Sequence, residues 1–219
     1  MSQSVLPIRA GINCYLLPGA EGFVLVDTGP AVARRRLLRG LCQAGCGPGD
    51  LRLAIITHGD ADHIGCCVLL RDSYGAKLAS HEAEVRALET GRMENRKERP
   101  DRKPWFFRAL LPLGMLFGRA ETFSPDTLLE DSESLESYGV DATILHLPGH
   151  TRGSIAVFTG EGDLICGDLF WSMHRPRLHP LIDDLDAARA SVERIRSLSV
   201  RRILPAHGRP FSPGEVPMD

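Results

Sequence analysis

Four side chains that commonly bind metals fall within one stretch of six residues: His58, Asp60, Asp62 and His63. The stretch directly follows an apolar segment, residues 53–57, that is typical of a buried strand. Because side chains two apart in an extended chain point the same way, His58 and Asp60 can converge on one point. A turn into a following helix would bring Asp62 and His63 to the same place. This density of ligand-type residues predicts a metal site at the end of the strand.

Three more residues of ligand type each follow a predicted strand farther along the chain. They are His150, Asp168 and His207, found in Pro-Gly-His-Thr, Cys-Gly-Asp and Pro-Ala-His-Gly sequences. Seven such groups at one edge of the fold fit two ions better than one, and imidazole with carboxylate suits zinc, iron or manganese. We therefore expect two divalent metal ions as cofactors, with zinc as the first candidate.

Each of these residues also has an ordinary structural explanation. A single His58 or His207 is more often a hydrogen-bonded histidine than a metal ligand, and Asp62 alone suits the start of a helix. All of these explanations would have to hold at once for the ordered set to be accidental. A metal site is therefore the better interpretation of the set.

The other four histidines lack this support from neighbouring motifs. They are His81, His146, His174 and His179. We expect His146 to point away from the metal edge. His174 and His179 lie in the segment 171–180, just past Asp168, and either could reach the site.

The order and spacing of the ligand-type residues resemble the metallo-β-lactamase-fold hydrolase superfamily. Members of that family carry T-H-x-H-x-D-H-x-G after a strand, then G-H-T-x-G-S, a G-D at a strand end and a late H-G. This chain has Thr-His-Gly-Asp-Ala-Asp-His-Ile-Gly at residues 57–65, His-Thr-Arg-Gly-Ser at 150–154, Gly-Asp at 167–168 and His-Gly at 207–208. Val-Asp-Thr-Gly at residues 26–29 also resembles the end of an early strand in the family. The resemblance covers residues 13–210.

The resemblance implies two metal sites that share one bridging carboxylate, Asp168. The first site would consist of His58, Asp60 and His150. The second site would consist of Asp62, His63 and His207. Asp62 would also be catalytic, because in the family it is placed to orient the attacking nucleophile or to receive its proton.

This chain departs from most members of the family at Asp60, where they have His. Two divalent ions bring a charge of about +4, and Asp62, Asp168 and a bridging hydroxide remove about three, so Asp60 takes the sum to about zero. A less positive cluster should acidify bound water less than a His-rich one and should accept iron or manganese more readily. We still expect a filled site, because zinc also accepts a carboxylate oxygen.

The resemblance implies a metal-dependent hydrolase in which a metal-bound hydroxide attacks a small ester, lactone or thioester. Two alternatives stay open. An acidic residue at position 60 resembles the di-iron redox branch of the family, although that branch normally carries a flavin domain. A non-catalytic metal-binding module would follow if Asp60 marks a decayed site. Two zinc ions would favour the hydrolase, two irons the redox enzyme, and one ion or none the binding module.

Composition excludes some other classes of protein. The chain has 219 residues, 43% of them apolar and 25% charged, which suits one globular domain. A formal net charge of −2 gives no reason to expect a nucleic-acid partner. The longest apolar stretch, residues 109–118, is too short to span a bilayer and contains Pro112 and Gly114. The N-terminal residues do not resemble a secretory signal and the six cysteines are sparse, so we expect a cytoplasmic protein with reduced thiols.

The elements that must position the ligands are strands followed by helices in both halves of the chain. Expected strands are residues 13–17, 22–27, 53–57, 76–80, 143–147, 154–158, 163–166 and 202–204. Expected helices follow Pro30 as far as Gly45, and then cover residues 62–74, 82–89 and 185–198. Two sheets packed face to face with helices outside would bury these apolar faces, which predicts a mixed α/β fold, an αβ/βα sandwich.

Residues 91–123 have a different composition and are interpreted as a helical insertion in a single domain, 1–219. A basic run, 92–103, is followed by the apolar run 105–120. We expect this insertion to cover the metal edge as a lid. Its residues Trp105, Phe106 and Phe117, together with His174, are candidates to contact a small-molecule substrate. A homodimer contact or plain packing explains the apolar run equally well, and a solvated linker explains the basic run.

Overall fold

A computed structural model describes residues 4–91 and 122–216 of the chain. Its largest sheet has the strand order β1-β2-β3-β4-β5-β6. These strands are β1 (Leu6–Ala10), β2 (Ile12–Gly19), β3 (Gly22–Val26), β4 (Leu51–Ile55), β5 (Lys77–Ser80) and β6 (Thr127–Leu128). The first three pair antiparallel, and β3 to β6 pair parallel.

A second sheet has the strand order β12-β9-β8-β7, and a small third sheet has the order β11-β10-β13. The strands of the second sheet are β7 (Ala142–His146), β8 (Ile155–Thr159), β9 (Asp163–Ile165) and β12 (Arg202–Leu204). The small sheet contains β10 (Phe170–Ser172), β11 (Arg177–Leu178) and β13 (His207–Gly208). Strands β9 and β12 run parallel, and β7 runs in the same direction because both it and β9 are antiparallel to β8.

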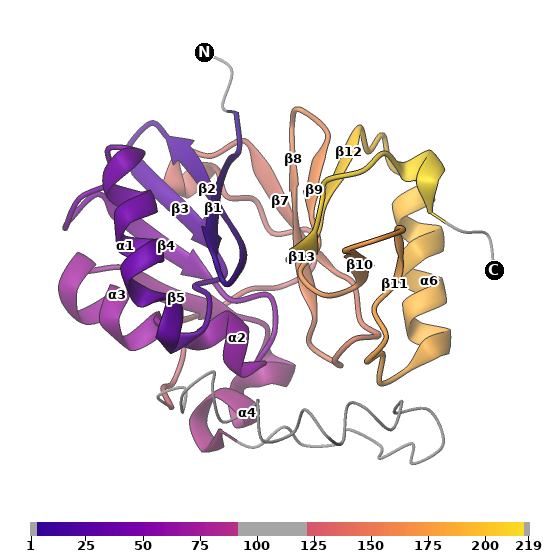
Figure 1. Cartoon of the computed structure of the whole chain (residues 1–219), viewed down its shortest axis with the longest axis horizontal. Helices are drawn as coiled ribbons and strands as arrows, with labels where there is room; N and C mark the ends of the chain where they lie inside the picture. Colours follow the sequence, from indigo (N-terminus) through magenta and orange to yellow (C-terminus); the bar gives the residue numbers. More distant parts are fainter. Residues whose placement is uncertain (1–3, 92–121, 217–219) are drawn as a thin grey trace.

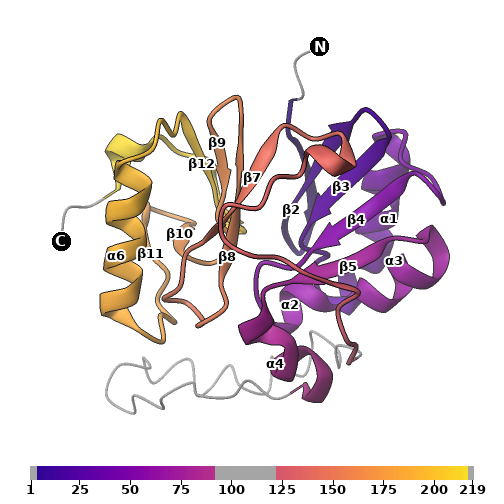
Figure 2. The same cartoon turned by 180° about the vertical axis from the view of Figure 1, so that it is seen from behind.

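Helices cover the outer face of each large sheet (Figures 1 and 2). On the first sheet lie α1 (Arg34–Gln43) and α3 (Cys67–Tyr74), and on the second lies α6 (Leu185–Arg196). Leu37 and Leu41 of α1 pack with Leu16 and Leu25 of the first sheet. Short helices α2 (Ala61–Ile64) and α4 (Val85–Thr90) and 3-10 turns at Ala31–Ala33, Glu82–Glu84, Glu136–Tyr138 and Pro213–Glu215 complete the described elements.

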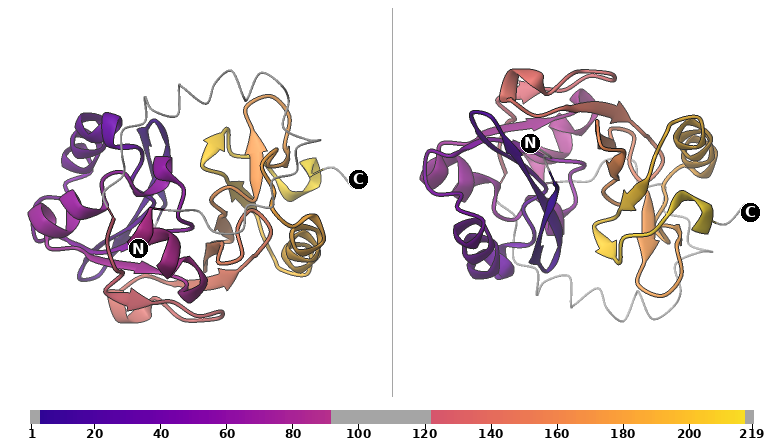
Figure 3. Two further views of the ribbon diagram at one scale, coloured as in Figure 1. Left: turned by 90° about the horizontal axis from the view of Figure 1, so that it is seen from below. Right: turned by 90° about the horizontal axis from the view of Figure 1, so that it is seen from above.

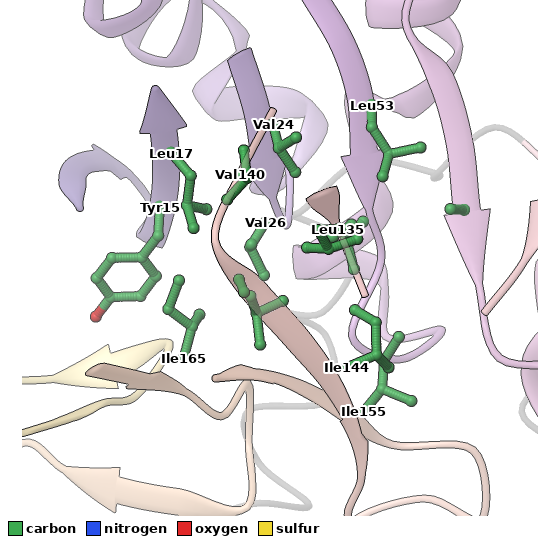
Figure 4. Packing of buried hydrophobic residues seen from close by; sticks show 14 of the residues in the cluster. Tyr15, Leu17, Val24, Val26, Leu53, Leu135, Val140, Ile144, Ile155 and Ile165 are labelled. Carbon is green, nitrogen blue, oxygen red and sulfur yellow. The ribbon is translucent and has the colours of Figure 1, made fainter. Parts of the chain in front are cut away.

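The main core lies between the two large sheets, which face one another in Figure 3. Figure 4 shows Tyr15 and Val26 of the first sheet pointing toward Ile144 and Ile165 of the second. Alternate residues of a strand point to opposite faces, so one set of side chains fills this core and the other set packs under the helices. The predicted αβ/βα sandwich is confirmed.

The expected single helix over residues 62–74 is wrong, because α2 ends at Ile64 and α3 begins at Cys67. Two contacts interrupt it. A Cβ on Gly65 would lie 2.2 Å from the backbone nitrogen of Ala31, so this glycine allows a close approach of two chain segments. The Cys66 N–H donates to Thr28 Oγ1 at 3.1 Å instead of to a helical carbonyl.

Several smaller expectations also need correction. Strand β1 and the small third sheet were not expected, because β1 contains a proline and the strands of the small sheet have only two or three residues each. In the segment expected to be helical after Pro30, Val32 lies in a 3-10 turn and is 65% exposed, α1 begins at Arg34, and Cys42 is exposed. The other five cysteines are buried, and all six are free thiols as expected.

Residues 92–121 of the expected insertion lie outside the described residues. No helix in the described ranges is long and apolar enough to cross a bilayer.

Candidate metal centre

The parallel strands carry the sequence-predicted ligands to one edge of the molecule, because the carboxyl ends of parallel strands meet at the same edge. The chain leaves β4, β7 and β9 to reach His58, His150 and Asp168, while β13 begins at His207. Asp60 is the N-cap residue of α2, but its side chain makes no capping hydrogen bond. Asp62 and His63 lie within α2 itself.

The first group of side chains contains His58, Asp60 and His150. Asp60 Oδ2 lies 3.3 Å from His150 Nε2 and 3.6 Å from His58 Nε2. The two imidazole rings meet edge to face with their centroids 4.5 Å apart. One ligand atom from each of His58, His150 and Asp168 lies within 4.8 Å of the others. This arrangement has the residue types and spacing of one ion site.

The second group contains Asp62, His63 and His207, whose ligand atoms also lie within 4.8 Å of one another. His207 Nε2 is 3.3 Å from Asp62 Oδ2 and 3.5 Å from Asp168 Oδ2. His63 Nε2 is 3.6 Å from Asp168 Oδ1. Asp168 therefore belongs to both groups and lies between them. The candidate His and Asp groups support two metal ions.

The donor atoms of this cluster fit a pair of cations. The buried atoms without a hydrogen-bond partner within the described ranges include His58 Nε2, His63 Nε2 and Asp168 Oδ1. An unsatisfied buried polar atom costs about 1–3 kcal/mol, so several of them facing one another need a ligand there. Neutral imidazole nitrogen and carboxylate oxygen are ligands that divalent transition metals prefer.

Mutual attraction between the histidines and carboxylates dominates the electrostatics of the centre. Burial acts to lower the pKa of His207, but its contacts with Asp168 and Asp62 prevail and raise that pKa to about 9. Burial also acts to lower the pKa of His63. The charges of Asp27, Asp168 and Asp62 prevail and raise that pKa well above its ordinary value. Burial favours the neutral acid at Asp168, but the charge on His63 leads the interactions that hold its pKa well below the usual range.

Metal uptake should therefore release protons. At pH 7.5 the metal-free protein holds protons on His63 and His207, whose pKa values are raised, whereas a metal ligand must be neutral imidazole. Asp168 is already ionised because its pKa is lowered, so it contributes no proton. Zinc titration by calorimetry in buffers of different ionisation enthalpy measures this release. An observed heat that does not change with the buffer would contradict it.

Asp27 positions two of the candidate ligands from the end of β3. Its side chain is buried and its φ is +60°. The carboxylate accepts from the Thr57 N–H at 2.9 Å and lies 2.9 Å from His63 Nδ1. Thr57 Oγ1 contacts Asp27 and also lies 3.0 Å from His58 Nδ1. These contacts turn the Nε2 atoms of both imidazoles toward the centre. The Val-Asp-Thr-Gly motif was the only sign of this role in the sequence.

A histidine outside the predicted ligand set also reaches the centre. His179 is 5% exposed, and its Nε2 lies 3.4 Å from Asp168 Oδ2. Ligand atoms of Asp168, His179 and His207 lie within 4.8 Å of one another. Burial lowers the pKa of His179 to about 3 despite the opposing charge of Asp168, so the ring is neutral. Trp171 stacks on His207 with ring centroids 5.0 Å apart and also contacts His179.

Glu84 joins the loops that hold His58 and His150. Its buried carboxylate accepts from the Gly59 N–H at 2.8 Å through Oε2 and from the Gly153 N–H at 3.0 Å through Oε1. A Cβ at position 153 would lie 2.7 Å from Glu84 Cγ, which explains the glycine there. This bridge between two loops, the Glu84 clamp, had no signal in the sequence, because its partners are far away in the chain.

Replacing Glu84 with Gln should loosen the first group of ligands. The amide offers one oxygen and turns its NH₂ toward the second backbone N–H, which leaves a buried donor unsatisfied at a cost of about 1–3 kcal/mol. Urea unfolding of the metal-free variant measures that loss. Chelator competition should show weaker zinc binding as well. Glu82→Gln, at an exposed position of the same turn, is the control, and equal losses in both variants would argue against the clamp.

Other residues singled out from the sequence lie elsewhere. His174 is exposed and does not belong to the clusters found among the described residues. His146 lies 2.9 Å through Nε2 from the Arg152 carbonyl and stacks on His81 at 4.2 Å, away from those clusters. Trp105, Phe106 and Phe117 lie outside the described residues. Contact of Trp105, Phe106, Phe117 and His174 with substrate stays a prediction.

Residues 8–207 match the family described as the metallo-beta-lactamase superfamily. This chain belongs to that superfamily. Among relatives, this superfamily member is 28% identical over 209 residues to the hydroxyacylglutathione hydrolase GloC of Haemophilus influenzae, covering 84% of this chain and 88% of that protein. It is 23% identical over 215 residues to the probable metallo-hydrolase YflN of Bacillus subtilis. That match covers 88% of this chain and 77% of YflN. A match of 43% identity to the human metallo-beta-lactamase domain-containing protein 1 spans 72 residues, 33% of this chain and 26% of the human protein.

Solved structures of the superfamily share the fold. A metallo-beta-lactamase family protein from Thermus thermophilus aligns with a TM-score of 0.71 and 25% identity, covering 97% of this chain and 76% of that one. TTHA1623, solved in a di-iron-bound form, aligns with a TM-score of 0.68 and 25% identity, covering 98% and 96%. The di-zinc metallo-beta-lactamase LRA-12, from an Alaskan soil metagenome, aligns with a TM-score of 0.70 and 19% identity. The alignment covers 94% of this chain and 76% of LRA-12, and at this identity it shows a shared fold alone.

Proposed function

We propose that this chain is a hydrolase that uses two divalent ions, zinc first, to cleave a small ester, lactone or thioester. The observation that carries the proposal is the meeting of two groups of histidines and aspartates around the single buried carboxylate Asp168. Membership of a superfamily of metallo-hydrolases supports it. Iron or manganese could replace zinc at the same donor set.

His58, Asp60 and His150 would hold one ion and the second group the other, with Asp168 shared. When bound, such ions polarise a scissile carbonyl and lower the pKa of the attacking water. The side chains of Asp62 and His207 are 24% and 18% exposed, whereas His58 and His150 are fully buried. Substrate would therefore approach from the side of Asp62, whose carboxylate can orient a water molecule and hold its proton.

Among the three substrate classes, we propose a thioester first. GloC, at 28% identity, is named a hydroxyacylglutathione hydrolase. A bovine relative that is 25% identical over 91% of this chain and 74% of its own length is named an acyl-coenzyme A thioesterase. The partly exposed Trp171, stacked on His207, offers an apolar face beside the centre for the acyl part of such a substrate.

The test combines metal analysis with a substrate panel. Protein reconstituted with zinc is assayed for bound metal and for hydrolysis of acyl-glutathione and acyl-coenzyme A thioesters, p-nitrophenyl esters, lactones and a phosphodiester. The proposal expects two ions per chain and turnover of a thioester that His58→Ala abolishes. A protein that holds two zinc ions and hydrolyses no member of the panel would overturn it.

A di-iron redox enzyme is the second candidate. It is favoured by the acidic residue Asp60 beside His58 and His150, and by the di-iron form of TTHA1623. Metal analysis of protein purified without added metal separates the two candidates, because the redox enzyme requires two irons. One ion or none would instead favour a non-catalytic metal-binding module.

Replacing Asp60 with His should change the zinc centre in a defined direction. The substitution removes one negative charge from the first group, so the centre becomes more positive and acidifies the attacking water more strongly. We expect tighter zinc retention in chelator competition, because imidazole nitrogen suits zinc better than a carboxylate oxygen does, and a pH–rate profile that rises about half to one pH unit lower. An unchanged profile would contradict this account of Asp60.

A further inference from the structure

His179 reaches the centre because a hairpin folds back over Asp168. Strands β10 and β11 pair antiparallel, and the His179 N–H donates to the Leu169 carbonyl at 3.1 Å. Leu169 is the residue that follows Asp168. The backbone of His179 is thus tied to the neighbour of the shared carboxylate. Its side chain has little freedom, since it is buried against Trp171 and lies 4.8 Å, ring to ring, from His150.

The hydrogen bonding of His179 determines which of its nitrogens carries the proton. The Leu181 N–H donates to His179 Nδ1 at 3.2 Å, so Nδ1 must offer its lone pair. In a neutral imidazole the proton then resides on Nε2. Asp168 Oδ2 lies 3.4 Å from that nitrogen. A metal ligand would need a lone pair on Nε2, which would require Nδ1 to carry a hydrogen directed at the Leu181 N–H.

We propose that His179 is a positioning residue of the metal centre, not an eighth ligand: its Nε2–H holds Asp168 Oδ2 and so fixes the carboxylate between the two groups of ligands. This inference rests on the proposed function, because it assumes that Asp168 is a shared metal ligand. Asp168 Oδ1, which lies on the His63 side, is left for the ions. Carboxylate ligands are commonly held by such outer hydrogen bonds.

The next loop supports the same arrangement. The Asp183 and Asp184 N–H groups both donate to the Gly149 carbonyl at 2.9 Å, beside His150. The segment after β11 therefore connects His179 to the loop that carries a ligand of the first group. A fixed N–H donor beside Asp168 costs little entropy to maintain, because the fold already orders the ring.

The test compares His179→Leu with His179→Gln. Leucine keeps the volume and removes the donor, whereas the glutamine amide can place an N–H near the position of Nε2. Zinc affinity is measured by chelator competition, with loaded stoichiometry from elemental analysis. His179→Leu should weaken zinc binding about 10- to 100-fold, and His179→Gln should restore it to within about threefold of wild type. Met173→Leu, at an exposed position of the same hairpin, should bind as wild type does.

Cobalt substitution distinguishes positioning from ligation. The visible absorption of the cobalt-loaded His179→Gln protein should match wild type, because no ligand has changed. A weaker or shifted band in both variants would mean that His179 is a ligand and would overturn the proposal. Wild-type affinity in His179→Leu would overturn it too. Thermal melting of the metal-free proteins identifies misfolding. If His179→Leu does not fold, the proposal still requires that His179→Gln has the zinc affinity and the cobalt absorption expected above, and it is overturned if either differs.

These outcomes are separate from the fate of the proposed function. A wild-type protein that binds two ions but hydrolyses nothing refutes the hydrolase and leaves the affinity test of His179 valid. A wild-type protein that binds no divalent ion refutes both. If the wild-type protein binds two ions and is an active hydrolase, and His179→Leu changes neither metal binding nor hydrolysis, only the positioning role is refuted.

Discussion

Asp168→Asn is expected to reduce hydrolysis about a thousandfold and to leave the protein unable to hold two ions. Among the described residues, Asp168 is the one carboxylate that lies within 4 Å of histidines from both groups of candidate ligands, His150 in the first and His63 and His207 in the second. The amide keeps the volume of the side chain but removes the negative charge that two cations would share. Losing ~4 kcal/mol of electrostatic stabilisation corresponds to about three orders of magnitude in rate. Elemental analysis and initial rates on the best substrate of the panel measure both effects.

A second buried aspartate provides the matched control for this variant. Asp163 is 1% exposed and forms ion pairs with Arg201 and Arg202, remote from the metal groups in the described ranges. Asp163→Asn should lower the melting temperature, since it removes the charge of a buried carboxylate that pairs with two partly exposed arginines, yet the protein should still bind two zinc ions. If Asp168→Asn also retained both ions, the shared-ligand role of Asp168 would be wrong.

Asp27→Asn should selectively weaken the second group of ligands, with a loss of about 10- to 100-fold in affinity for one of the two ions. Asparagine suits the φ of +60° at this position. Its oxygen must stay on the Thr57 N–H, because that backbone donor cannot change. The amide NH₂ then faces His63 Nδ1, which must become an acceptor. The proton moves to Nε2, the atom that should bind metal, so the imidazole is left in the wrong tautomer.

Zinc titration monitored by calorimetry should resolve one unchanged and one weakened step in Asp27→Asn. Asp126→Asn is a suitable comparison, because Asp126 also accepts a backbone N–H, from Leu78 at 2.8 Å, but does not belong to the candidate ligands. That variant should keep two tight steps. Equal weakening of both steps in Asp27→Asn would indicate general damage to the fold in place of a change in the His63 tautomer.

Sequence reasoning located most of the candidate centre because its ligands follow strands. His150 and His207 are placed by the ends of elements whose apolar residues are easy to recognise, and parallel pairing brings those ends to one edge. The same reasoning predicted the two facing sheets, since the apolar faces of the strands need a common core. It did not find strand β1 or the break between α2 and α3. Those depend on pairing and on the close approach of Gly65 to the backbone of Ala31.

The residue types and their order were therefore enough to identify a superfamily, a sandwich and seven candidate ligands. Tertiary structure alone decided how those ligands are held: the contact of Asp27 with His63 joins residues 36 apart, and Glu84 joins loops through residues 25 and 69 positions away. His179 acquired its place from a hairpin too short to recognise in advance. The physical reason is that a hydrogen bond between distant segments depends on their final packing, which leaves no periodic pattern in the chain.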